Sequence, residues 1–81
     1  MRRHLLLALL ALPLAALAQA DVNDRLREAA RRNDLPAFRQ LLASGADVNA
    51  KDAQQDSAFL VAAREGHTDL VIAALAAGAD T

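Results

Sequence analysis

The stretch Gly45-Ala46-Asp47-Val48-Asn49 decides the fold, because its first three residues return as Gly78-Ala79-Asp80. The two copies lie 33 residues apart. A fixed period of about 20–50 residues is typical of solenoids, in which small supersecondary units stack on one another. The sequence therefore predicts a repeat architecture with two units.

The same offset relates much of the remaining chain without a gap. Further matches are Ala29-Ala30-Arg31 with Ala62-Ala63-Arg64, Leu42-Ala43 with Leu75-Ala76, Leu26 with Phe59, and Phe38 with Val71. The last two pairs keep apolar character although the residue changes. Such agreement indicates that both units have the same order of helices and turns.

The first unit is predicted to be a helical hairpin. Apolar spacing favours a helix from Asp24 to Arg32, capped by Asp21 or Asn23. Asn33 tolerates the left-handed conformation that ends a helix, and Asp34 can cap the next helix, which ends at Gly45. The arginines of the first helix favour a solvated face over a binding patch.

The second unit is predicted to follow the same plan. Ser57 caps a helix that reaches about Glu65, and Thr68 caps a further helix. The residues expected to face inward from the first of these helices are Phe59, Ala62 and Ala63. The predicted helix stops are Gly66 and Gly78. The fold class is thus all-α, with stacked helix-turn-helix repeats and connecting loops.

The N-terminus has the composition of a secretory signal peptide. Met1-Arg2-Arg3-His4 is basic, Leu5 to Leu17 is almost entirely Leu and Ala, and Ala18-Gln19-Ala20 offers small residues for cleavage after Ala20. This predicts export to the periplasm or beyond the cell, with membrane contact only during export; a retained membrane anchor is the alternative. Residues 21–81 would carry a net charge of −3, which favours neither nucleic acid nor an anionic membrane as a partner.

These residues resemble the ankyrin repeat. The family's pattern is matched in the second unit by Asp52, Ser57, Phe59, Ala62-Ala63, Gly66-His67, Leu70-Val71, Leu75 and Gly78-Ala79-Asp80. The first unit matches with Leu26, Ala29-Ala30, Phe38, Leu41-Leu42 and Gly45 to Asn49. The stretch from Gln55 to Leu60 is similar to exported bacterial ankyrin proteins. The resemblance implies repeats at 21–52 and 53–81, with structural roles for the glycines, the paired alanines and His67.

The resemblance also implies binding of another protein without catalysis or a cofactor. Family members bind through loop tips, which here lie in the polar connection between the units. The candidate residues are Val48, Asn49, Lys51, Asp52, Gln54, Gln55 and Asp56. Two departures stand out: Ser57-Ala58-Phe59-Leu60 replaces the family's Thr-Pro-Leu-His, and Gln55 replaces a turn glycine, which disfavours a tight hairpin.

Two alternative functions remain open at this point. Glu65, His67 and Asp69 could serve a metal-binding protein or an enzyme, although a lone histidine with carboxylates is a weak zinc set. The helix from Leu70 to Ala77 is apolar nearly all round and carries no polar cap. That helix predicts either self-association or that the chain is the N-terminal fragment of a longer ankyrin protein.

Overall fold

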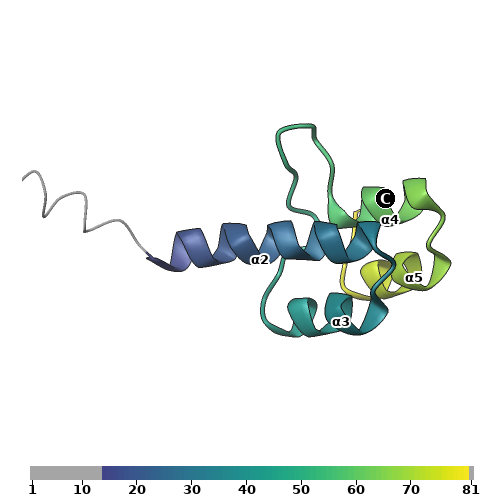
Figure 1. The fold of residues 1–81 in the computed structure, drawn as a ribbon, viewed down its shortest axis with the longest axis horizontal. Coiled ribbons are helices and arrows are strands. Elements are labelled where there is room, and N and C mark those ends of the chain that lie inside the picture. The colour runs from purple at the N-terminus through teal and green to yellow at the C-terminus, as the bar shows by residue number, and fades with distance from the viewer. Residues whose placement is uncertain (1–13, 81) are drawn as a thin grey trace, which may run out of the picture.

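The computed structural model describes residues 14–80, which form four helices and, within that range, no strand (Figure 1). The helices are α2 (Leu14–Arg31), α3 (Leu35–Ala43), α4 (Ala58–Glu65) and α5 (Thr68–Ala76). The predicted all-α class and the pairing of helices within each unit are confirmed. Most of the predicted signal peptide, residues 1–13, lies outside the described residues.

Helix α2 begins ten residues before the predicted start at Asp24, so in the uncleaved chain Asp21 and Asn23 lie within the helix and do not cap it. The residues from Leu14 to Ala20 are Leu, Ala and Gln, which all have favourable helix propensities and extend the helix backwards. The side chain of Asn23 has another role: its Oδ1 accepts a hydrogen bond from the backbone N–H of Asp47 at 2.7 Å. None of the helices in residues 14–80 combines the length and apolarity that a membrane crossing requires.

The predicted helix stops are confirmed. Positive φ angles occur at Asn33 (57°), Gly45 (101°), Gly66 (76°) and Gly78 (93°). Each follows the last turn of a helix, where the left-handed conformation lets backbone N–H groups reach the final carbonyls. The equivalent stops therefore close equivalent helices in both units.

Of the side-chain caps predicted for the three later helices, two are confirmed. Asp34 accepts from the N–H of Ala37 at 3.2 Å, and Ser57 accepts from the N–H of Leu60 at 3.1 Å. Thr68 is not a cap but the first residue of α5, because the helix begins one residue earlier than expected. His67 occupies the cap position, and its side chain makes no capping hydrogen bond.

The four helices pack as two hairpins laid side by side. Helix α2 contacts both α3 and α4, while α5 contacts both α4 and α3. The fully buried side chains of the first unit include Leu26, Ala30 and Phe38. The core of the described residues is Leu26, Ala29, Ala30, Phe38, Val48, Ala58, Val61, Ala62, Leu70 and Ala74.

The prediction that Ala63 faces inward is wrong. Ala63 is exposed, whereas Ala58 and Val61 of the same helix are buried. The helix turns these two residues toward the first unit, and Ala63 lies on the side facing away from it. Its counterpart Ala30 is 0% exposed and lies on α2, which packs against α4 of the second unit.

Asn49 joins the two Gly-Ala-Asp segments across the units. Its Nδ2 donates to the carbonyl of Gly78 at 3.0 Å, and its Oδ1 accepts from the N–H of Asp80 at 2.8 Å. Asn23 makes the corresponding bond to Asp47 in the first unit. An asparagine on the N-terminal side thus holds each of these segments in place.

Candidate functional site

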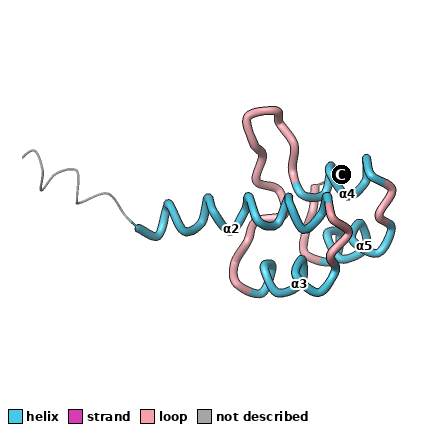
Figure 2. Tube along the Cα trace, viewed as in Figure 1, coloured by secondary structure: helices cyan, strands magenta, loops and turns pink. Residues whose placement is uncertain are grey.

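Part of the connection between α3 and α4 projects away from the helices, and this connection is drawn in pink in Figure 2. Its N-terminal base is anchored by Val48, whose side chain is 3% exposed and belongs to the core. A turn follows, in which the N–H of Ala50 donates to the carbonyl of Asp47 at 3.2 Å. We refer to residues 50–56 as the finger.

The backbone of the finger is organised by Asp52. Its Oδ1 accepts from the N–H groups of Gln54 and Asp56, both at 2.9 Å. Backbone bonds close the same turn, since the N–H of Asp52 donates to Asp56 O at 3.1 Å and that of Gln55 to Asp52 O at 3.0 Å. Gln55 adopts φ 65°, so a closed turn forms even though glycine is absent. Gln55 was expected to disfavour a tight hairpin, and a closed turn nevertheless forms, because the bonds to Asp52 offset the backbone strain.

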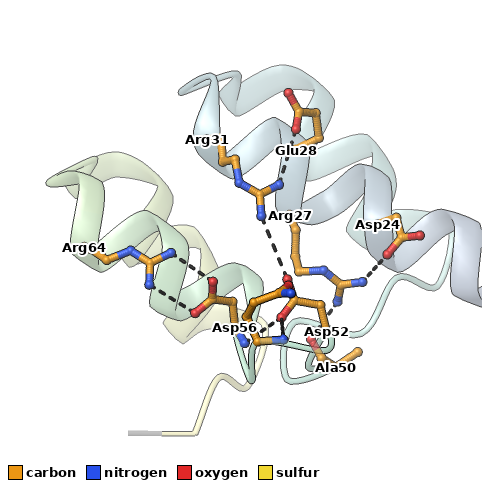
Figure 3. A network of polar contacts seen from close by, with 9 residues as sticks. Asp24, Arg27, Glu28, Arg31, Ala50, Asp52, Asp56 and Arg64 are labelled. Carbon is orange, nitrogen blue, oxygen red and sulfur yellow. Dashed lines mark hydrogen bonds and ion pairs between the residues drawn. The ribbon is translucent and has the colours of Figure 1, made fainter.

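Three arginines from two helices hold the finger against the stack (Figure 3). Arg27 donates from Nη1 to the carbonyl of Ala50 at 2.8 Å. Arg31 places Nη2 3.9 Å from Oδ2 of Asp52. Arg64 binds Asp56 through two parallel hydrogen bonds, each 3.1 Å long. We call Arg27, Arg31 and Arg64 the arginine clamp.

The clamp contains a buried charge with defined partners. Arg27 is 6% exposed and also pairs with Asp24, one turn earlier on α2. A guanidinium that has lost most of its water needs such acceptors, because an unpaired buried charge is strongly destabilising. Arg27 therefore attaches the base of the finger to α2 and does not lie on a solvated helix face.

The electrostatics of the clamp favour the charged forms of Asp56 and Arg64. Hydrogen bonds from Arg64, reinforced by its positive charge, hold the pKa of Asp56 below its ordinary value. The same hydrogen bonds raise the pKa of Arg64. Asp56 is consequently ionised throughout the neutral range, and the finger remains tied to α4.

The predicted partner-binding residues divide into three groups. Lys51, Gln54 and Gln55 are exposed, together with Ala53. Those that are half-buried and engaged in structural bonds are Asn49, Asp52 and Asp56. Val48 is not a surface residue, since its side chain packs in the core, and its assignment to a binding loop is wrong.

Sequence reasoning missed the clamp, because the arginines of α2 were assigned to a solvated face. One signal could have found it: Arg31 and Arg64 occupy the same position in the two units, 33 residues apart. In the structure both point to carboxylates of the finger that lies between them. A charged residue that recurs at the same position of both repeats indicates a shared contact more strongly than a charged residue that only belongs to a local cluster.

Glu65, His67 and Asp69 do not form a metal-binding group. Within residues 14–80, no three histidine or acidic side chains come close enough together to hold an ion. His67 instead places Nε2 3.4 Å from the carbonyl oxygen of Arg31. A carbonyl only accepts, so Nε2 carries the proton in this contact, which links the α4–α5 turn to the end of α2.

Comparison with known proteins agrees with this geometry. The family model described as ankyrin repeats (many copies) matches residues 26–75, which is more than half of the chain. The chain belongs to the ankyrin repeat family. It is also similar to the mitochondrial disaggregase of Homo sapiens, with 47% identity over 55 residues. That match includes 68% of this chain and 8% of the length of the relative.

Membership explains how the parts of the finger are used. Ankyrin repeats generally serve as modules for protein–protein interaction, and the family is typically non-catalytic. The helical hairpins form the scaffold, and the connections between them project from it. The finger is one of these projecting connections, and its tip is exposed.

Proposed function

We propose that this chain is an exported, non-catalytic ankyrin module that binds another protein through the tip of its finger. The observation that carries the proposal is an exposed tip, formed by Lys51, Ala53, Gln54 and Gln55, on a base held by the arginine clamp. A loop held in one conformation loses little entropy on binding, so more of its contact energy appears as affinity. Lys51 and the two glutamines supply one charge and several hydrogen-bonding groups.

Export is supported by the sequence before the repeats. The basic start, the Leu/Ala run and the small residues at Ala18 and Ala20 follow the order of a cleavable signal. After cleavage, α2 would begin at Asp21, where a carboxylate at a helix N-terminus is favourable. The intact mass of protein recovered outside the inner membrane tests this: loss of residues 1–20 supports export, and a membrane-bound chain that retains Met1 contradicts it.

Site-specific photo-crosslinking tests the binding role. A photoreactive residue at Gln54 should yield a discrete protein adduct in exporting cells, whereas the same residue at Gln40 should not. Gln40 is the matched control, because it is also an exposed glutamine but lies on α3. Adducts of equal yield at both positions, or none at Gln54, would refute binding through the finger.

The clamp provides a second readout in the same assay. Arg64→Gln removes the paired hydrogen bonds to Asp56 and leaves every tip residue unchanged. The adduct at Gln54 should then decrease while the helical circular dichroism signal persists. An unchanged adduct would mean that the clamp does not prepare the finger for binding.

A second candidate is that the chain is the N-terminal part of a longer ankyrin protein. It is favoured by the similarity to a relative of which this chain spans only 8%. Sequencing of the transcript beyond the codon for Thr81 distinguishes the two. Further repeat codons in frame would favour the longer protein, and the binding surface could then include later units.

A further inference from the structure

The exposure of Ile72 is not explained by the stacking of the repeats. Its side chain is 60% exposed, which is the largest exposed fraction among the large apolar residues of the described chain. The 33-residue offset places Arg39 at the same position of the first unit, and Arg39 is exposed although the second unit packs against the first. A further repeat stacked in the same way would therefore leave Ile72 uncovered.

The other two exposed large apolar residues occupy different positions of the repeat. Leu60 is 42% exposed and Leu75 is 45% exposed. Their counterparts in the first unit are Arg27, which is buried, and Leu42, which is half-buried. The repeat architecture covers these two positions at least in part when a second unit follows, so the exposure of Leu60 and Leu75 carries no argument about a partner.

Ile72 lines an open groove of about 360 Å³ between α3 and α5. The residues of the groove are Arg39 and Leu42 from α3, with Ile72, Ala73, Ala76 and Ala77 from α5 and its C-cap. We call these six residues the outer groove. Both helices lie on the side of α2 and α4 that is away from the finger (Figure 1). The outer groove is therefore separate from the site described above.

Arg39 gives the outer groove a positive charge that has no partner within residues 14–80. It is the only charged residue among the six. The other arginines of that range each have a polar partner, whereas the side chain of Arg39 forms neither a hydrogen bond nor an ion pair. A guanidinium group pairs best with a carboxylate, which can accept two parallel hydrogen bonds from it. The charge of the groove is thus complementary to a partner that carries a carboxylate.

The shape of the outer groove suits a helix laid along it. The small side chains of Ala73, Ala76 and Ala77 leave space for the side chains of another helix, and Leu42 and Ile72 provide apolar contacts. Hydrophobic grooves commonly accept an amphipathic helix whose apolar residues recur at i, i+3, i+4 and i+7. A small molecule fits less well, because small-molecule sites enclose most of the surface of the ligand, whereas this groove is open to solvent.

We propose that the outer groove binds an amphipathic helix of another protein, which places an aliphatic side chain beside Leu42 and Ile72 and a carboxylate against Arg39. Covering Ile72 with the aliphatic residue removes apolar surface from water, which is favourable. The surrounding apolar residues also exclude water from the ion pair at Arg39 and so strengthen it. This inference depends neither on the finger nor on export.

The charges of the chain favour a protein over an anionic membrane as the occupant. Recognition of anionic lipids uses clusters of about four to eight basic residues, whereas the outer groove contains Arg39 alone. Residues 21–81 carry a net negative charge, which opposes adsorption to a negative surface. A single carboxylate beside apolar residues pairs with Arg39 without that repulsion.

Fluorescence anisotropy with two designed peptides tests the proposal on the full chain. One labelled alanine-based peptide of about 15–20 residues, long enough to form a helix, carries two leucines four residues apart and one glutamate on the same face. The second peptide has lysine in place of the glutamate. The glutamate peptide should bind about tenfold more tightly or better, since Arg39 meets an opposite charge in the first case and a like charge in the second.

Variants of the chain locate the contact. Arg39→Glu should reverse the preference between the two peptides, and Ile72→Ala should weaken the binding of both by about fivefold or more. Gln40→Glu is the matched control, because it introduces a glutamate at the neighbouring exposed position of α3, outside the outer groove, and should leave the preference unchanged. The helical circular dichroism signal should be the same in all three variants, since the three side chains are exposed.

Each of the following results would overturn the proposal. Failure of both peptides to bind would show that the groove does not accept such a helix, and a preference that survives Arg39→Glu would place the contact elsewhere. Binding to phosphatidylserine vesicles that requires Arg39, without binding to the glutamate peptide, would identify a membrane as the occupant. A dimer in sedimentation of the chain alone that Arg39→Glu dissociates would identify a second copy.

Discussion

Leu26→Ala and Leu60→Ala make the same chemical change at two sites that differ in coverage. Leu26 is 0% exposed in the core, and Leu60, on α4, is 42% exposed. Leucine truncation inside a closed core costs about 2–5 kcal/mol, since a cavity remains. Complete burial of a leucine contributes about 1.5–3 kcal/mol, so the partly covered Leu60 should lose only about 1 kcal/mol.

These magnitudes are large relative to the stability of so small a domain. A core of this size rarely supplies more than about 3–5 kcal/mol. Leu26→Ala should therefore be largely unfolded at room temperature, while Leu60→Ala should melt about 4–8 °C below the wild type. Both residues lie within helices, so the change in helix propensity is similar and cancels in the comparison.

Thermal melts followed by circular dichroism at low protein concentration provide the measurement. Dilution matters, because any self-association would add to the apparent stability. Equal losses of melting temperature would refute the packing described here. They would mean either that the second unit does not cover α2 or that Leu60 is covered by a contact outside residues 14–80.

Three further perturbations test separate parts of the molecule. Gly45→Val should cost at least about 1 kcal/mol because Gly45 has φ 101°, whereas Gln54→Val in the same connection should have little effect; equal melting temperatures would count against strain at the helix stop. Asn49→Ala should cost about 1–3 kcal/mol in urea unfolding, since two backbone groups near the C-terminus lose their partner; no change would show that this bridge is dispensable. Asp56→Asn should melt below the wild type at neutral pH, where Asp56 is paired with Arg64. Because the pKa of Asp56 is lowered from 3.8, this contribution is present above that pH and disappears as the pH falls through the lowered value. A melting-temperature difference independent of pH would contradict that assignment.

The periodic features of the fold could be predicted from the sequence, and the contacts between distant segments could not. Gly45, Gly66 and Gly78 required only local backbone preferences, and their positions were predicted correctly. The predicted start of α2 was wrong, because the residues before Asp21 and Asn23 have high helix propensity and extend the helix past these two possible caps.

In the candidate site, too, local features could be predicted and contacts between distant residues could not. The polar composition of the finger predicted its projection, but not that Val48 fills the core or that Asp52 closes the turn. The clamp depends on Arg27 and Ala50, 23 residues apart, meeting in space. The prediction that Ala63 is buried was wrong, although its counterpart Ala30 is buried. Both positions are alanine, so the sequence alone cannot show that their exposure differs.

Thiol labelling measures the stacking register most directly, because the chain contains no cysteine. Ala30→Cys and Ala63→Cys each introduce one thiol at equivalent positions, of which the first is 0% exposed and the second exposed. In dilute native protein, the thiol at position 63 should react rapidly with a maleimide, and the thiol at position 30 should be strongly protected until the protein unfolds. Equal reaction rates in the native state would contradict the stacked arrangement of the two units and everything inferred from it.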